Sequence, residues 1–529
     1  MDFTILDKSL CGRIGLLKTR HGNIKTPALL PVLNPVKQEI SAQEISKIGF
    51  DAVITNAYLL WKNLKGKIVD IHDYLNFNGP IMTDSGAYQI LRYGSVEVSP
   101  EEIINYEKSI NSDIAVILDV PTGPKDNWHE AKKSVEITLS RAAESIKIRD
   151  GERLWVGPIQ GGRYLDLVTL SAKSMLQYGF DIYAVGSPTG LMEGYKFSTV
   201  LAMVITAKNI IGPAYPLHLF GAGHPMFFPF MAAVGVDLFD SAAYALYAQD
   251  DRYITPSGTF RLNELKELPC NCPVCSKTSI EELKVMNKDE RRRFLMMHNL
   301  YVSLSEIKRV RQHIIEGTLW ELCEERSHAH PSLFKAMKLL VKFYKYLEKC
   351  DPVTKSTVHG LFFYNNMTAL RPQTYRHVSR IISNYSPDHP TKLIILLPPI
   401  ITRPYIRSSI IKNIIQLVNN SKYANSTCIA VLGGPFIFTP IELSEIYPLS
   451  QYEGIACSKM LSKIFVENLP KLKFLNELET AILISDKRHK FLFDNVKNYL
   501  SKKEIKIVQV NINKGESIIK ILKDILGAL

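Results

Sequence analysis

Residues 79–90 read GPIMTDSGAYQI, and in this stretch the short apolar segment PIMT ends on the carboxylate of Asp84 and is followed by Gly86. Asp, Ser and Gly are common wherever a strand stops, so this stretch alone is typical of a turn. The same arrangement recurs along residues 1–240. This recurrence indicates that residues 79–90 contain one of several similar strands, and the number and spacing of these strands predict the fold.

Eight short apolar runs with the character of strands lie in residues 1–240. They are residues 27–32, 51–55, 80–83, 114–118, 154–159, 182–186, 216–220 and 236–239. Longer connecting segments have helical periodicity, as in HEAKKSVEITLSRAAESIKI from His129. Strands that alternate with helices predict parallel βαβ units, and eight units predict a closed α/β barrel, the (β/α)8 or TIM barrel. A doubly wound open sheet is the alternative, but no GxGxxG follows the first strand.

Polar or glycine-rich corners follow these apolar runs. They are Asn34, Asn56, Asp84, Asp119, Gln160-Gly161-Gly162, Ser187, Gly221-Ala222-Gly223-His224 and Asp240. In a barrel, the carboxyl ends of the strands converge on one face, and that face carries the chemistry. Three aspartates and two glycine-rich corners on one face therefore predict an active site.

The length of 529 residues indicates two or more domains, because single cores stop growing well below that size. The composition is that of a globular chain, with 46% hydrophobic and 22% charged residues. No apolar run is long enough to cross a bilayer, and residues 1–20 do not form a signal peptide. We therefore expect a cytoplasmic protein that does not enter a membrane.

The positive charge is concentrated in the last third of the chain. Residues 1–350 carry 41 Lys and Arg against 39 Asp and Glu, whereas residues 351–529 carry 23 against 13. Such an excess is typical of a polyanion-binding surface, although a lysine-rich solubilising surface explains it equally well.

A second domain is predicted beyond a boundary near Asp351-Pro352. Four strand-like runs there alternate with helical stretches, at residues 393–397, 428–434, 481–485 and 505–510. We therefore predict a catalytic barrel over residues 1–350 and a smaller, basic α/β domain over residues 351–529.

Three of the eight cysteines stand close together in the sequence CNCPVC. Cys270, Cys272 and Cys275, completed by His298, have the spacing of a closed tetrahedral zinc site, which is structural rather than catalytic. We therefore predict a zinc-binding module over about residues 261–312, with one zinc ion per subunit. The other histidines that could complete the set are His313, His328 and His330. Arg291-Arg292-Arg293 and the group Lys308, Arg309 and Arg311 flank His298, and they fit a solvated helix face or a phosphate contact equally well.

Many ordered segments within residues 10–350 resemble the tRNA-guanine transglycosylases, specifically their archaeal branch. These segments are TPALLPVLNP, ITNAYLL, GPIMTDSGAYQ, ILDVPT, PIQGG, YAVGS, HLFGAGHP, GVDLFDSAAYALYA and ELPCNCPVC. The resemblance implies a transferase that exchanges guanine at position 15, in the D-arm of tRNA, for free 7-cyano-7-deazaguanine. This exchange is the first step of archaeosine biosynthesis on tRNA.

The resemblance also implies roles for individual residues. Asp240 matches the nucleophile that forms an aspartyl-ribose intermediate, and Asp84 matches the acid/base residue, although the reverse assignment stays open. Replacing a base with retained configuration requires two displacements, which explains the pair of carboxylates. The residues that match substrate contacts are Asp119, Gln160, Gly186, Ser187, Ser85 and Tyr88, with Tyr88 stacking on the base.

The C-terminal part departs from the family pattern. Many archaeal members end in a PUA domain that binds the tRNA acceptor end, whereas the tail KGESIIKILKDILGAL predicts a helix that closes an α/β domain. A separate PUA-type protein is therefore an expected partner, beside tRNA and a second copy of the chain. Residues 391–455 resemble the intermediate C-terminal domain of archaeal members. The motif PPIITRPYIRSS resembles one that carries chemistry in the related archaeosine synthase, but the cysteine that this resemblance implies is absent, so we predict a non-catalytic domain.

Three alternatives stay open at this point. A non-catalytic tRNA-binding paralogue would share the fold, but the intact Asp84, Asp119 and Asp240 argue against it. A metal-dependent hydrolase would need clustered histidines and carboxylates at the strand ends, and the sequence lacks them there. The third alternative is a transglycosylase that takes a different deazaguanine.

Overall fold

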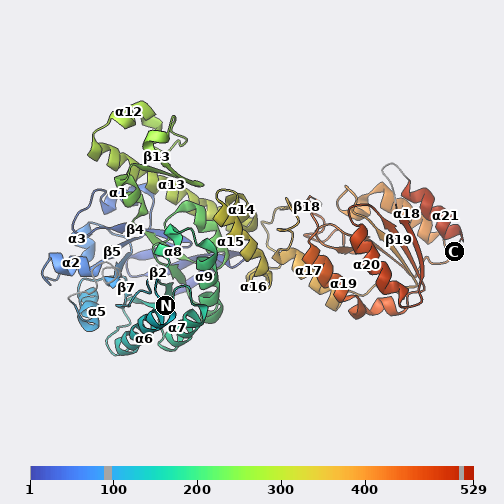
Figure 1. The fold of residues 1–529 in the computed structure, drawn as a ribbon, viewed down its shortest axis with the longest axis horizontal. Coiled ribbons are helices and arrows are strands. Elements are labelled where there is room, and N and C mark those ends of the chain that lie inside the picture. The colour runs from blue at the N-terminus through green and yellow to red at the C-terminus, as the bar shows by residue number, and fades with distance from the viewer. Residues whose placement is uncertain (1, 88–97, 455, 512–516, 529) are drawn as a thin grey trace. The chain divides into compact units, whose positions relative to one another are not determined.

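The computed structural model describes residues 2–87, 98–454, 456–511 and 517–528 (Figure 1). The chain divides into two compact units, Met1–Leu340 and Val341–Leu529. The division falls inside helix α15 (Pro331–Lys342). The assignment of catalysis to the first part of the chain and of a basic, non-catalytic role to the second stays a prediction.

Eight parallel strands close into a barrel in the first unit, in the order β10-β11-β4-β5-β6-β7-β8-β9. Their bounds are β4 (Ala28–Leu33), β5 (Val53–Asn56), β6 (Ile81–Asp84), β7 (Ile114–Val116), β8 (Leu154–Ile159), β9 (Ile182–Val185), β10 (Leu217–Leu219) and β11 (Leu238–Ser241). Each predicted apolar run supplies one of these strands, so the predicted barrel is confirmed.

Helices connect the barrel strands and pack around them (Figure 1). Their bounds are α1 (Ala42–Ile48), α2 (Ala57–Asn63), α3 (Ile71–Leu75), α5 (Pro100–Ser109), α6 (Trp128–Ser145), α7 (Leu165–Gln177), α8 (Thr189–Glu193), α9 (Phe197–Ile211), α10 (Phe228–Ala233) and α11 (Ala243–Gln249). Helix α6 begins at a capping box formed by Asn127 and Glu130, which satisfies the free amides of its first turn. It covers residues 129–145 of the segment 129–148 that the sequence predicts to be helical.

Side chains alternate along each strand, so every second residue points into the barrel. The apolar interior includes Ile54, Met82 and Leu238. Two positions farther along the same three strands stand Asn56, Asp84 and Asp240, which line a cavity. The period-two pattern of a strand therefore places an apolar core in the middle of the barrel and polar groups at its carboxyl end.

A three-stranded antiparallel sheet, which the sequence analysis does not predict, precedes the barrel. It consists of β1 (Phe3–Ser9), β2 (Gly12–Thr19) and β3 (Gly22–Lys25). Leu17 and Ile24 of this sheet are fully buried and belong to the core of the barrel. The sheet therefore extends the barrel core with residues from outside the eight strands.

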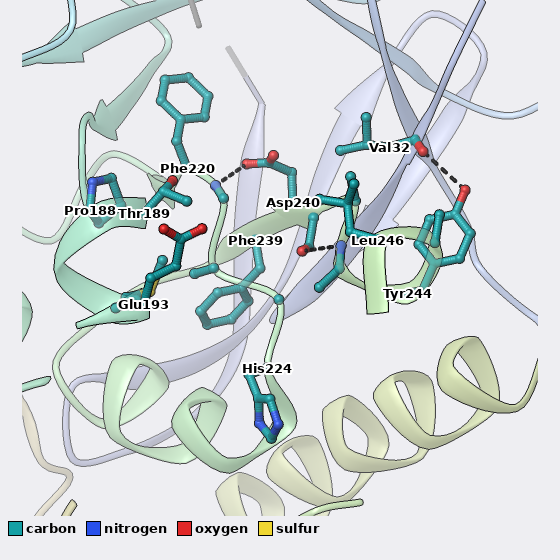
Figure 2. A pocket seen from close by; sticks show the side chains of 18 of the residues that line it. Val32, Pro188, Thr189, Glu193, Phe220, His224, Phe239, Asp240, Tyr244 and Leu246 are labelled. Carbon is teal, nitrogen blue, oxygen red and sulfur yellow. Dashed lines mark hydrogen bonds between the residues drawn. The ribbon is translucent and has the colours of Figure 1, made fainter. Parts of the chain in front are cut away.

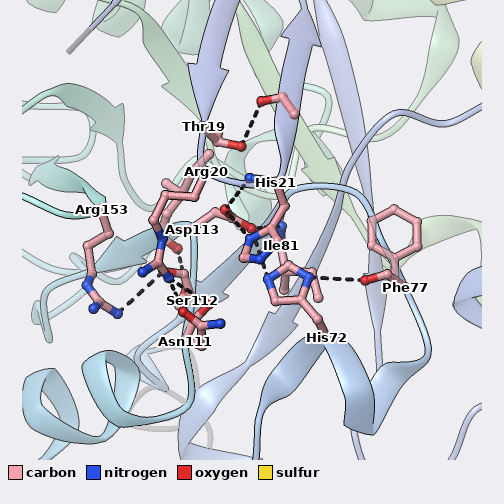
Figure 3. Close-up of polar contacts among 12 residues, drawn as sticks. Thr19, Arg20, His21, His72, Phe77, Ile81, Asn111, Ser112, Asp113 and Arg153 are labelled. Atoms are coloured by element: carbon pink, nitrogen blue, oxygen red, sulfur yellow. Dashed lines mark hydrogen bonds and ion pairs between the residues drawn. The ribbon is translucent and has the colours of Figure 1, made fainter.

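Asp113 stands at the amino end of β7 and links this sheet to the barrel (Figure 3). Its Oδ1 lies 2.8 Å from His21 Nδ1, and its Oδ2 accepts a hydrogen bond of 2.9 Å from the amide of Ile81. His72 Nε2 lies 3.1 Å from the same Oδ2, and the backbone carbonyl of Phe77 holds its Nδ1 at 3.1 Å. This network lies at the end of the barrel opposite to the polar strand ends.

The chain continues after the barrel with a hairpin and a run of helices. They are β12 (Arg252–Thr255), β13 (Gly258–Arg261), α12 (Ile280–Val285), α13 (Lys288–Glu316) and α14 (Leu319–Ser327), followed by α15. Near the start of α13, Arg291 pairs with Asp251, Arg292 with Glu39 and Arg293 with Glu44. All three arginines thus pair with carboxylates of the same unit in this structure, and the choice between a solvated helix face and a phosphate contact stays a prediction.

The second unit contains a five-stranded sheet in the order β17-β16-β15-β19-β20. The strands are β15 (Leu393–Leu397), β16 (Thr427–Leu432), β17 (Phe438–Pro440), β19 (Thr480–Ser485) and β20 (Lys506–Asn511). The main helices are α16 (Tyr344–Cys350), α17 (Pro372–Asn384), α18 (Ser409–Asn419), α19 (Lys459–Glu467), α20 (Lys490–Ser501) and α21 (Ile518–Ala528). The four predicted strands and the closing helix are present, so the predicted α/β fold of this part is confirmed. Within the part of the chain that the structure describes, no helix has the length and apolar character needed to cross a membrane.

Candidate active site and metal cluster

A cavity of about 1440 Å³ opens at the carboxyl ends of the barrel strands (Figure 2). Its wall includes most of the site residues that the sequence predicts, namely Asp84, Asp119, Gln160, Gly186, Ser187 and Asp240. Ser85 is fully buried, and its hydroxyl donates to the carbonyl of Ile117 at 3.2 Å. Tyr88 lies outside the described residues. The structure thus gathers six of the eight predicted residues around one cavity.

Asp240, on strand β11, is held through one of its two carboxylate oxygens. Its Oδ1 lies 2.9 Å from Nε2 of His218. The same oxygen accepts a hydrogen bond of 3.0 Å from the amide of Gly221 (Figure 2). Gly221 has a φ of 65°, and a Cβ added there would lie 2.5 Å from Thr189 Oγ1, so the corner requires glycine. The glycine-rich corner after β10 thereby aims a backbone donor at the carboxylate.

Asp84, at the end of strand β6, is poised to carry a proton near neutral pH. Burial, together with the negative charges of Asp119 and Asp240, raises the pKa of the Asp84 carboxyl to about 7. Its Oδ2 accepts a hydrogen bond of 2.9 Å from Asn56 Nδ2. The turn that follows requires glycine, because Gly86 has a φ of 98° and an added Cβ would lie 2.5 Å from Tyr58 Cβ.

Asp119 and Gln160 form a second polar group in the same cavity. Gln160 Nε2 donates to Asp119 Oδ2, and Gln160 Oε1 accepts from the amide of Thr122 at 3.1 Å and from Ser187 Oγ at 2.8 Å. Burial raises the pKa of the Asp119 carboxyl to about 6, although the Gln160 hydrogen bond lowers it. A side chain at Gly186 would collide with Gln160, so this glycine leaves room for the amide. The group offers both donors and acceptors to a planar, polar ligand.

The family of the chain is shown by comparison with known proteins. The family model described as queuine tRNA-ribosyltransferase matches residues 7–332. The chain belongs to this family. As a member of the queuine tRNA-ribosyltransferase family, it is an enzyme of the pentosyltransferase class.

Curated relatives agree with this assignment over most of their length. The tRNA-guanine(15) transglycosylase of Sulfolobus acidocaldarius is 46% identical over 380 residues, which are 71% of this chain and 76% of the relative. The protein of the same name from Pyrobaculum aerophilum is 43% identical over 458 residues, 86% of this chain and 90% of the relative. The similarity to this second relative therefore extends well beyond the barrel.

The transferase also contains a cluster that can hold a metal ion. Ligand atoms of Cys270, Cys272, Cys275 and His298 all lie within 4.8 Å of one another. His298 Nδ1 lies 3.3 Å from Cys275 Sγ, while its Nε2 donates to the carbonyl of Ile254 at 2.9 Å. This second hydrogen bond leaves Nδ1 free of a proton and turned toward the thiols, as in a metal-ligating histidine.

The other histidines considered in the sequence analysis have different surroundings. Nδ1 of His313 lies 2.7 Å from Thr318 Oγ1 near the end of α13. The ring of His330 stacks on that of Tyr195. His298 is fully buried, and its ring stacks on Tyr253 at 3.6 Å. The structure therefore selects His298 as the fourth member of the cluster.

The sequence pattern does not reveal His218, whose Nε2 lies 2.9 Å from Asp240 Oδ1. It lies in HLFGAGHP, one of the segments that carry the family resemblance, but a histidine within a strand run has no spacing signal of its own. Its contact with Asp240 depends on the pairing of β10 with β11, where His218 lies opposite Leu238. Only the register of the two strands reveals the contact.

Proposed function

We propose that the chain is a tRNA-guanine(15) transglycosylase, which replaces guanine at position 15 of tRNA with free 7-cyano-7-deazaguanine and so begins archaeosine biosynthesis on tRNA. The observation that carries the proposal is the cavity in which Asp84, Asp119 and Asp240 meet. The names of the relatives support the position of the exchanged base, because the chain spans 90% of the Pyrobaculum aerophilum protein. The resemblance of the sequence to the archaeal branch supports the choice of 7-cyano-7-deazaguanine as the incoming base.

In the proposed mechanism, Asp240 attacks the anomeric carbon of the ribose and the bond to guanine breaks. The departing guanine takes a proton from Asp84, whose pKa of about 7 leaves much of this carboxyl protonated near neutral pH. The incoming deazaguanine then gives a proton to Asp84, attacks the same carbon and displaces Asp240. Two inversions retain the configuration, and the RNA backbone stays intact.

Base recognition in this proposal rests on the Asp119–Gln160 group. Asp119 accepts hydrogen bonds from the N–H edge of guanine, and Gln160, Gly186 and Ser187 contact the remaining polar atoms of the base. The hydrogen bond between Gln160 and Asp119 holds the carboxylate in place before the base arrives. Substrate contacts of Ser85 and Tyr88 stay predictions.

A base-exchange assay tests the proposal. Incubation of the protein with radiolabelled guanine and bulk tRNA that carries guanine at position 15 should transfer label into the RNA without cleaving it. A non-catalytic paralogue would bind tRNA and transfer no label. A metal-dependent hydrolase would release base or cut the strand and would lose activity with a chelator. A homodimer and a separate PUA-type partner stay predictions.

We further propose that the Cys₃His cluster binds one structural zinc ion. Three thiolates and one imidazole form the donor set that zinc prefers in closed tetrahedral sites. The cluster connects the segment around Cys275 to α13 through His298, and Tyr253 of β12 lies 3.4 Å from Cys275 Sγ. A bound ion would thus connect the hairpin, the cysteine loop and the long helix.

Replacing Cys272 by Ser should remove zinc and destabilise the protein, because binding of a structural metal is coupled to folding. We expect the zinc content to fall well below one ion per chain and the unfolding midpoint to fall by at least about 5 °C. Metal analysis and calorimetry measure the two effects. Cys457→Ser is the control, since Cys457 Sγ lies outside the cluster at 3.5 Å from Ser462 Oγ. Equal melting of Cys272→Ser and wild type would contradict the zinc site.

Removing residues 351–529 should weaken tRNA binding and flatten its dependence on salt. The positive charge is concentrated in this part of the chain, and each lost phosphate contact reduces the number of released counterions. Filter binding at several salt concentrations measures the slope. Free guanine should bind the shortened protein as it binds the full chain, which controls for an intact barrel. An unchanged affinity and slope would mean that the charge only solubilises the surface.

A further inference from the structure

His218 is a fully buried polar residue in an apolar part of the barrel interior. Strand pairing places it opposite Leu238 on one side and Ala184 on the other, and the ring of Phe220 lies 4.7 Å from its own. Burying an imidazole among apolar side chains is unfavourable unless hydrogen bonds compensate for the lost water. Its position therefore calls for an explanation other than core packing.

The only described side chain that explains this position is Asp240. His218 Nε2 lies 2.9 Å from Asp240 Oδ1, whereas Nδ1 of the same ring is buried and has no hydrogen-bond partner among the described residues. A carboxylate accepts hydrogen bonds, so Nε2 carries the proton and donates it. Among the described residues, the one hydrogen bond of the His218 side chain therefore goes to Asp240 Oδ1.

The hydrogen bonds that Asp240 accepts involve only one of its two carboxylate oxygens. Oδ1 accepts from His218 Nε2 and from the amide of Gly221, which lies 3.0 Å away. Among the described residues, Oδ2 has no hydrogen-bond donor. One oxygen is therefore fixed to the protein, and the other is left to react.

We propose that His218 is a positioning residue that orients Asp240 for attack on the ribose. This inference rests on the proposed function, in which Asp240 is the nucleophile. By holding Oδ1, His218 fixes the rotation of the carboxylate and presents Oδ2 toward the cavity. A nucleophile held in its attacking geometry reacts faster than a freely rotating one, because less orientational freedom is lost in the transition state.

Two substitutions separate this role from simple packing. His218→Phe keeps an aromatic ring of similar size but removes the donor. His218→Gln removes the ring but keeps an N–H group that can reach Asp240. The rate of covalent adduct formation should be measured in a single turnover with saturating tRNA, together with the tRNA concentration at half-saturation and the unfolding midpoint.

We expect His218→Phe to slow adduct formation by about 10- to 100-fold, the effect of losing one hydrogen bond to a charged group. The half-saturating tRNA concentration should change by no more than about two-fold, because His218 acts on the nucleophile and not on RNA binding. His218→Gln should restore most of the rate. A structural role alone would predict the opposite, since Phe would preserve the packing and Gln would disturb it.

Two results would overturn the inference on its own: a normal rate in His218→Phe, or a loss in His218→Gln as large as in His218→Phe. The wild-type protein provides the separate test of the proposed function. If it forms no adduct with tRNA, Asp240 is not a nucleophile toward RNA, and both the proposed function and the inference are wrong.

Discussion

Asp240→Asn is expected to abolish the covalent protein–RNA adduct and to reduce base exchange by at least about 10⁴-fold, because an amide cannot replace a carboxylate as the nucleophile. The substitution preserves the shape of the side chain. The contact with the amide of Gly221 can persist, so the fold and the cavity should be retained. A denaturing gel after incubation with tRNA detects the adduct, and labelled guanine measures the exchange.

The matched control is Asp250→Asn. Asp250 is an exposed aspartate that follows α11 and does not line the cavity. The Asp250→Asn variant should keep full base-exchange activity. An adduct that persists in Asp240→Asn would show that another residue attacks the ribose, with Asp84 as the first candidate.

Asp84→Asn is expected to lower turnover by about 10²- to 10⁴-fold, the range in which general acid–base groups contribute. In the wild type, exchange should weaken as the pH rises above 7, because the carboxyl with a pKa of about 7 then loses the proton that guanine needs on leaving. The residual activity of Asp84→Asn should lack this decline. The pH dependence of kcat/KM for both proteins tests the prediction, and an identical decline in both would contradict it.

The same pKa predicts how pH affects stability. The Asp84 carboxyl has a raised pKa in the folded state, so folding binds a proton between about pH 4 and pH 7. The contribution of this group to stability is present at low pH and is lost as the pH rises through 7. The stability of Asp84→Asn minus that of wild type should therefore be larger at pH 8 than at pH 5. Thermal unfolding of both proteins at the two pH values measures this difference. A general loss of stability would lower the midpoint of the variant equally at both.

The barrel could be predicted from the sequence because its signal is local and repeated. Each strand is a short apolar run that ends in a polar or glycine-rich corner, as GPIMTDSG does at Asp84. The carboxyl ends of parallel strands meet on one face, so Asp84, Asp119 and Asp240 could be placed together without knowing which strands are neighbours. The cysteine cluster is equally predictable, because three of its four members lie within six residues.

The parts that the sequence could not predict depend on pairing between distant segments. In the amino-terminal sheet, β1 spans seven residues of which only the last is buried, so it lacks the buried apolar run that marks the barrel strands. The contact of His218 with Asp240 requires the register of β10 against β11. The link between Gln160 and Asp119 joins two corners that are 41 residues apart. Such contacts follow from the closed barrel and not from the residues on either side.

The most direct test of the proposed function is mass analysis of a single tRNA after incubation with the protein and 7-cyano-7-deazaguanine. The tRNA should carry guanine at position 15, and fragments from a base-specific nuclease should be assigned to their positions. The proposal predicts that only the fragment with nucleotide 15 changes mass, by the difference between the two bases, in an otherwise intact chain. An unchanged tRNA, a change at another position, or a cut strand would contradict it.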